Sequence, residues 1–390
     1  MLPLAMVDDL LGIAECGHDS LALNTFINTQ IEMKKLQFHT PDEKGKSKCN
    51  VMHVGKKSDI CPQLQVHGTV MKKISHDTYL GDIISCDGTN DLNILNRVSK
   101  GHGKITQIMN MLDRVTLGSH YFRIALMLRE SLFLNSILTN AEAWYGLSNK
   151  QVDQLEMVDR ILLRIFLDTP VSTPVEALYL ELGIFRIGTI IKARRINFLH
   201  TLLSTSEKEM TYKVLLAQWN HPVKQDWTEQ VREDLSEFRI EPNLDSLKNK
   251  SSNAFKKFVK IKASEYEFRK LMELKQKHSK MDSLSYSRLE MQNYLKLENC
   301  DARGARTVFK YRTRMALYGE NFRQNDTPVS CPLCDQHLDN QAMGFNNCQV
   351  TKINVQIQGL YTDLFKQNVP KILVKTLQQI DDFRKENIET

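Results

Sequence analysis

The chain has 390 residues, 42% of them hydrophobic and 25% charged, which is typical of a globular protein with two or more domains and excludes a fibrous or broadly disordered chain. Its formal net charge is +6, and its eight cysteines lack the dense spacing of a secreted disulfide-linked domain, which favours an intracellular, reducing environment. No apolar run approaches the length of a membrane span, so we expect no membrane association.

The first predicted element is a hairpin. Residues 2–7 and 10–14 are short apolar runs of strand length, with Asp8 and Asp9 between them. This spacing predicts two strands joined by a tight turn, with both acids at or near the turn.

A helix is expected next, over 18–38, with Asp19 or Ser20 as its N-terminal cap. The alternation and composition of the following residues predict short strands over 49–55, 64–70 and 78–84.

From residue 90 to about 204 the hydrophobic period becomes helical, and Pro170 and Pro174 mark a break before the last helix of this region. The predicted helical segments are 92–115, 122–144, 149–167 and 174–203. A further helical tail is expected from about Asn354.

Two adjacent carboxylates within an apolar hairpin need neutralisation, because like charges resist joint ionisation away from water. Mg²⁺ supplies it: two such ions about 3.5–4 Å apart can clamp the attacking and leaving oxygens of a phosphoryl transfer. The alternative is an ordinary surface turn, where Asp is common.

Several stretches together resemble the reverse transcriptases of non-LTR retrotransposons. They are "AMVDDLLGIAE", "SLALNTFINTQIEMKKLQFH", "KCNVMHVGK", "YLGDIIS" and "NAEAWYGLS". The resemblance implies that Asp8 and Asp9 are Mg²⁺ ligands of the polymerase palm, with Met6 at a position where the family has an aromatic residue. It also implies that Lys48, with Lys46 as the other option, lies near the phosphates of the incoming nucleotide.

In the family, a third metal-binding Asp and the fingers precede the Asp-Asp pair. We therefore expect the chain to be the C-terminal portion of a polymerase, inactive alone, that works with an N-terminal palm and fingers segment. Its partners would be an RNA template and a DNA primer, and the parent element would act in the nucleus. The alternatives are a nucleic-acid-binding protein without catalysis and a decayed element copy without function.

The element order and the resemblance predict an α+β fold that is mostly α-helical. We expect a partial palm, made of a short antiparallel sheet plus a helix, at 1–87, a thumb-like helical domain at 88–205 and a basic helical region at 206–325. A zinc-knuckle-like segment and a C-terminal helix are expected at 326–390.

Cys331 and Cys334 are spaced like the start of a zinc knuckle, since two thiolates two residues apart can hold one ion in a tight turn. His337 and Cys348 are the predicted third and fourth Zn²⁺ ligands, although the spacing is not that of a standard finger. The alternative is a degenerate knuckle with reduced thiols.

Residues 245–323 contain nineteen Lys and Arg against nine Asp and Glu, a local net charge of +10, with aromatic residues interleaved. This pattern predicts contact with a nucleic-acid backbone, and the alternative is a solvated helix face. The densest group is Arg303, Arg306, Lys310, Arg312 and Arg314. In a continuous helix, Arg306, Lys310 and Arg314 would share one face, because they are four residues apart. Arg194 and Arg195 are weaker candidates.

Overall fold

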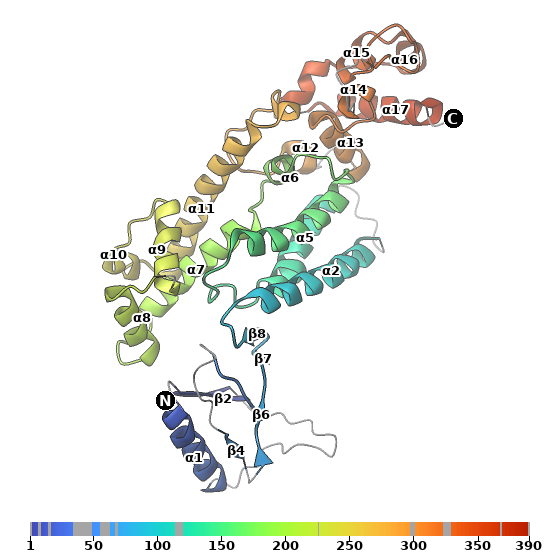
Figure 1. Cartoon of the computed structure of the whole chain (residues 1–390). Helices are drawn as coiled ribbons and strands as arrows, with labels where there is room; N and C mark the ends of the chain where they lie inside the picture. Colours follow the sequence, from blue (N-terminus) through green and yellow to red (C-terminus); the bar gives the residue numbers. More distant parts are fainter. Residues whose placement is uncertain are drawn as a thin grey trace. The chain divides into compact units, whose positions relative to one another are not determined.

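The computed structural model describes residues 2–6, 9–14, 17–33, 49–54, 63–66, 69–113, 120–224, 226–296, 301–322, 329–366 and 369–388. The chain forms two compact units, Met1–Asn96 and Arg97–Thr390. Helices predominate, and the strands within the described ranges pair only in twos (Figure 1). The predicted class, α+β and mostly α-helical, is confirmed, while the finer four-part division stays a prediction.

The first unit begins with the predicted hairpin. β1 (Leu2–Met6) and β2 (Asp9–Ile13) are antiparallel, with Leu2 opposite Ile13 and Met6 opposite Asp9. Gly12 lies in β2, and a Cβ atom at this position would lie 3.1 Å from the Leu23 side chain of the next helix. The hairpin and that helix therefore pack closely.

That helix, α1 (Gly17–Met33), covers much of the predicted segment. The expected caps are wrong, because Asp19 and Ser20 lie inside the first turn. An acid in this position is still favourable, since the N-terminal end of a helix carries partial positive charge. Leu23 is buried, but Phe26 on the predicted apolar face is 54% exposed.

Three pairs of short strands follow. They are β3 (Asn50–Val51) with β6 (Lys72–Lys73) in parallel, β4 (Gln65–Val66) with β5 (Thr69–Val70) and β7 (His76–Tyr79) with β8 (Asp82–Ser85), both antiparallel. The single strands predicted over 64–70 and 78–84 are thus hairpins. In the second, Leu80 and Gly81 have φ of 47° and 89°, and two successive positive values form the tight turn that reverses a strand.

The second unit is helical among its described residues. After α2 (Asp91–Asp113), which begins in the first unit, its longer helices are α3 (Tyr121–Leu128), α5 (Asn149–Leu167), α6 (Val175–Leu182), α7 (Ile187–Leu203), α8 (Met210–Asn220), α9 (Trp227–Glu237), α11 (Ser252–Lys275), α13 (Ala302–Arg312) and α17 (Lys371–Ile388). Shorter ones are a π-helical turn (Arg129–Leu134), α4 (Asn135–Ile137), α10 (Leu244–Lys248), α12 (Asn293–Lys296), α14 (Gly319–Phe322), α15 (Gln341–Asn346), α16 (Gln349–Asn354) and two 3-10 turns, Ser279–Met281 and Tyr361–Phe365.

Local sequence explains where these helices begin and end. Ser148 and Gln151 form a reciprocal capping box at the start of α5. The helix predicted over 174–203 is divided at Gly183, whose φ of 65° ends α6. Pro174 stands just before α6, as its fixed φ favours.

The core of this unit includes a cluster of apolar side chains from α7, α8, α9, α10 and α11, helices that Figure 1 shows gathered together. Leu199 and Phe255 are among its fully buried members. Each buried Leu or Phe contributes about 1.5–3 kcal/mol relative to an exposed one, so this cluster holds α11 firmly against α7.

Five Arg–carboxylate pairs also lie in the second unit, and in each the acid is no more than 5% exposed. They are Arg129–Asp159, Arg186–Glu267, Arg195–Asp234, Arg312–Glu181 and Arg384–Asp339. Because a buried carboxylate without a partner costs several kcal/mol, these arginines are needed for the fold.

Candidate functional site

The first predicted site is the acid pair at the β1–β2 turn. Asp9 is the first residue of β2 and pairs with Met6 across the hairpin. Asp8 and Lys48 lie outside the described residues, as does Lys46. The Mg²⁺ and nucleotide roles of these residues therefore stay predictions.

The second predicted site is a cluster of three cysteines near the C-terminus. One sulfur from each of Cys331, Cys334 and Cys348 lies within 4.8 Å of the other two. Cys331 and Cys348 are 2% and 1% exposed, so the cluster is largely enclosed.

A tight turn brings Cys331 and Cys334 together. The backbone N–H of Cys331 donates to the carbonyl of His337 at 2.7 Å, and the N–H of Asp335 donates to the carbonyl of Cys331 at 2.8 Å. Asp335 has φ of 54°, a left-handed conformation that Asp tolerates better than most residues. Cys348 arrives from the other side as the N-terminal cap residue of α16.

The spacing of the sulfurs suits a metal. The Sγ atoms of Cys331 and Cys348 are 3.9 Å apart. A disulfide would require about 2.05 Å, whereas two thiolates on one tetrahedral Zn²⁺, each at about 2.3 Å, are separated by about 3.8 Å. The separation of the Cys331 and Cys348 sulfurs therefore fits zinc ligation, and Cys334 lies close enough to be a third ligand.

Two of these thiols have shifted acidities. Burial raises the pKa of Cys331. Burial also acts to raise the pKa of Cys348, but the nearby polar groups of Thr351 and the thiols of Cys334 and Cys331 act in the opposite direction, and the net effect lowers the pKa below its ordinary value. A lowered pKa favours the thiolate of Cys348, which is the form that binds metal.

His337 is not part of this cluster, contrary to the prediction that it is a Zn²⁺ ligand. Only two residues separate it from Cys334, and its carbonyl is used in the turn that holds Cys331. A fourth ligand would come from elsewhere, such as water.

The third predicted site is the basic group on α13, and here the structure corrects the sequence interpretation. Arg312 is 1% exposed, and its guanidinium lies 3.0 Å from Glu181. It is a core ion pair and is not accessible to a nucleic acid. Arg195, the weaker candidate, is likewise buried against Asp234, and Arg194 donates to the carbonyl of Leu138.

The remaining α13 residues do not share one free face. Arg306 donates to the carbonyl of Phe166 at 2.9 Å and lies over the ring of Tyr121. Lys310 pairs with Asp168 at 2.7 Å, and Arg303 pairs with Asp382. The helix ends at Arg312, so Arg314 (φ 53°) lies beyond it and off the predicted face.

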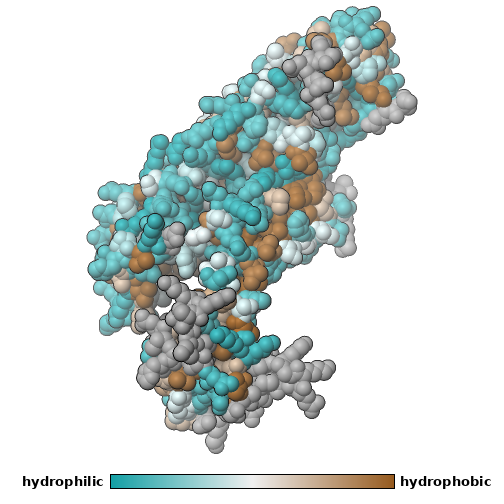
Figure 2. All heavy atoms as spheres, viewed as in Figure 1, coloured by the Kyte–Doolittle hydropathy of each residue, from teal (hydrophilic) through white to brown (hydrophobic). Residues whose placement is uncertain are grey.

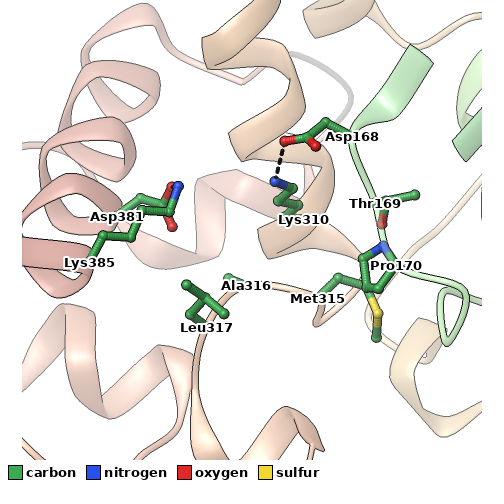
Figure 3. Close-up of a pocket in the computed structure, with 9 residues that line it drawn as sticks. All are labelled: Asp168, Thr169, Pro170, Lys310, Met315, Ala316, Leu317, Asp381 and Lys385. Carbon is green, nitrogen blue, oxygen red and sulfur yellow. Dashed lines mark hydrogen bonds and ion pairs between the residues drawn. The ribbon is translucent and has the colours of Figure 1, made fainter. Parts of the chain in front are cut away.

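Lys310 and Asp168 also line an open pocket of about 490 Å³ (Figure 3). Pro170, Met315 and Leu317 form apolar parts of its wall, and a second pair, Asp381 with Lys385, comes from α17. Lys310 lowers the pKa of Asp168, so this carboxylate stays charged to lower pH than usual. With both lysines paired to acids, the pocket has no uncompensated charge to select a ligand.

Basic residues that do face solvent are found on α11 instead. Lys256, Lys257 and Lys260 are exposed and make no ion pair with any residue that the structure describes. The sequence interpretation included them in the basic stretch 245–323 but singled out the α13 residues, because charge is densest there. The useful signal was the scarcity of acids around the α11 lysines.

No family model, curated protein or solved structure matches the chain. Among the described helices, none has both the length and the apolar character needed to cross a membrane.

Proposed function

We propose that the chain is part of the reverse transcriptase of a non-LTR retrotransposon. The parent reaction would be template-directed nucleotidyl transfer, in which the primer 3′-hydroxyl bonds to the α-phosphate of a deoxynucleotide and pyrophosphate leaves. Mg²⁺ held by Asp8 and Asp9 would supply the positive charge that favours both the attacking and the leaving oxygen. The observation that supports it most is the β1–β2 hairpin, whose Met6–Asp9 pair closes a two-residue connection containing Asp8. This is the arrangement that the resemblance implies for a palm metal site.

In this proposal the first unit is a partial palm and the helices after it belong to the thumb and its continuation. Asp8 and Asp9 would each hold Mg²⁺, and Lys48 would contact the nucleotide phosphates. The third carboxylate of the palm and the fingers would come from an N-terminal segment of the same polyprotein. RNA template and DNA primer would be the bound substrates, and the parent element would work in the nucleus.

Cleavage mediated by Fe²⁺ tests the proposed metal site without requiring catalysis. Fe²⁺ bound in place of Mg²⁺ generates radicals that cut the backbone nearby, so fragments should arise from cuts within the β1–β2 hairpin. We expect Asp8→Asn to abolish these fragments and excess Mg²⁺ to suppress them, because a divalent ion at this turn depends on carboxylate oxygens.

Asp113→Asn is the matched control, since Asp113 is an exposed acid on α2. It should leave the cleavage pattern unchanged. Cleavage elsewhere, or a pattern indifferent to Asp8→Asn, would show that the hairpin is an ordinary acidic turn and that the proposal is wrong.

A second function, nucleic-acid binding without catalysis, is favoured by the Cys331–Cys334–Cys348 cluster. We propose that these thiolates hold one Zn²⁺ ion with a structural role, because the site is enclosed and its thiolates come from a turn and a helix start. In this proposal the zinc ion takes no part in any reaction. It would fix the segment around α15 and α16.

A further inference from the structure

The lysines at the start of α11 form an unusual concentration of charge. Residues 246–264 contain six Lys and no Asp or Glu. The whole chain has a formal net charge of +6, so all the remaining residues together sum to zero. The net positive charge of the protein thus resides in nineteen consecutive residues.

Three of these lysines make neither an ion pair nor a contact over an aromatic ring with the residues that the structure describes. Lys248 pairs with Glu207 and Lys262 with Glu265, while Lys250 lies over the ring of Phe258. Lys256, Lys257 and Lys260 remain, all exposed. With about 100° of rotation per helical residue, the three fall within an arc of about 100° on one side of α11.

The backbone beneath these lysines is held in place. Ser251 caps α11, and Phe255 stacks on His200 with ring centroids 4.2 Å apart. The Nε2 atom of His200 lies 2.9 Å from the carbonyl oxygen of Lys250. Figure 2 shows mainly hydrophilic residues over this part of the second unit. The lysines are therefore presented on a fixed helix, and a polyanion binding there would order only the side chains.

Their position also costs stability in the free protein. Neighbouring like charges on a helix repel one another. This repulsion is relieved when a polyanion is bound. The site is therefore electrostatically complementary to closely spaced negative charges, as in a phosphodiester backbone.

We propose that Lys256, Lys257 and Lys260 form a docking surface for a nucleic-acid backbone, read without sequence preference. This inference rests on the proposed function, which supplies RNA and DNA as partners, and it replaces the α13 residues as the contact surface. From Lys256 to Lys260 the helix rises about 6 Å, nearly two phosphate spacings of a strand at about 3.4 Å each, so the three lysines can reach three successive phosphates.

The test compares two triple variants of the full chain with equal net charge. One is Lys256→Gln, Lys257→Gln, Lys260→Gln. The other, the control, is Lys352→Gln, Lys371→Gln, Lys375→Gln, at three lysines that are exposed on α16 and α17. Gln has nearly the helix propensity of Lys, so both variants should fold as the wild type does, which circular dichroism checks.

The measurement is binding of a single-stranded RNA of mixed sequence, titrated at several salt concentrations. Three lost phosphate contacts should reduce the slope of log affinity against log salt by about two and weaken binding roughly hundredfold near 0.1 M salt. The control variant should keep the wild-type slope. Melting of the α11 variant should be unchanged or slightly higher, because repulsion is relieved.

Several outcomes would overturn the inference. They are an unchanged slope in the α11 variant, an equal loss in the control, and no RNA binding by the wild type. Loss of binding to phosphatidylserine vesicles, with RNA binding intact, would assign the surface to a membrane instead. None of these results bears on Fe²⁺ cleavage at Asp8, so failure here is distinguishable from failure of the proposed function.

Discussion

Glu181 illustrates how much of this protein depends on single buried charges. Its carboxylate accepts hydrogen bonds from the hydroxyls of Tyr286 and Tyr294 at 2.5 and 2.6 Å, and pairs with Arg312. Burial raises the pKa of both tyrosines well above the usual value, so they remain protonated donors. The one carboxylate therefore joins α6, α12, α13 and the segment before α12.

Arg312→Met should consequently be far more damaging than Lys310→Met, two residues away on the same helix. Removing one member of a buried pair costs about 3–5 kcal/mol, whereas a pair whose acid is exposed, such as Lys310–Asp168, contributes about 0–1 kcal/mol. Urea unfolding followed by circular dichroism would measure both. Similar losses for the two variants would show that the Arg312–Glu181 pair is not buried as described.

Zinc content should follow the three thiols. We expect one Zn²⁺ per chain by elemental analysis, and a loss of that zinc in Cys331→Ser because a thiolate ligand is removed. His337→Ala should keep its zinc, since His337 lies outside the cluster. Cys86→Ser, at a free cysteine of the first unit, is the control. Equal zinc in wild type and Cys331→Ser would exclude the site.

At the scale of elements, the junction between α6 and α7 depends on a glycine, both for its backbone conformation and for a close backbone contact. Gly183 has φ of 65°, and a Cβ atom there would lie 2.1 Å from the backbone nitrogen of Met291. The segment before α12 can approach α6 only because this side chain is missing. Close approach also permits the hydrogen bond from the N–H of Gln292 to the carbonyl of Glu181, at 3.0 Å.

Gly183→Ala should therefore destabilise the protein by at least about 1–3 kcal/mol, the cost of a left-handed non-glycine residue alone. Gly103→Ala is its control, because Gly103 lies within α2 with open space around it. There alanine should stabilise by about 0.5–1 kcal/mol. Thermal unfolding of the two variants should thus move in opposite directions, and a harmless Gly183→Ala would contradict the close approach.

The sequence pattern predicted elements well where one hydrophobic periodicity continues over a long segment. The helix expected over 149–167 matches α5 in full, and the first hairpin was predicted from two apolar runs around a turn. It failed where one residue changes the direction of the backbone. Leu80 and Gly183 have positive φ, and hydrophobic periodicity carries no sign of that.

The candidate sites were less predictable because they depend on partners distant in sequence. Cys331, Cys334 and Cys348 were found from spacing alone, since a metal-binding turn is largely local. The role of Arg312 was missed because Glu181 lies 131 residues away. The number of basic residues along a stretch of sequence does not distinguish arginines that are paired inside the core from lysines that face solvent.

Across the molecule as a whole, the predominance of helices explains why composition and periodicity sufficed for the fold class. The uneven charge carries different information. Residues 246–264 carry six positive charges and no negative one, so a long-range attraction of a polyanion is directed in part at this end of α11. Most other basic groups discussed above are matched by acids and act in folding.

The buried ion pairs decide how this protein can be dissected. Three of them, Arg186–Glu267, Arg195–Asp234 and Arg312–Glu181, join residues on either side of position 205. A fragment starting at 206 would carry Glu267, Asp234 and Arg312 into an interior that no longer holds their counter-charges. Such a piece should be insoluble or unfolded when expressed alone, even though a helix boundary lies nearby. Shortened versions for biochemical work should therefore keep residues 97–390 intact.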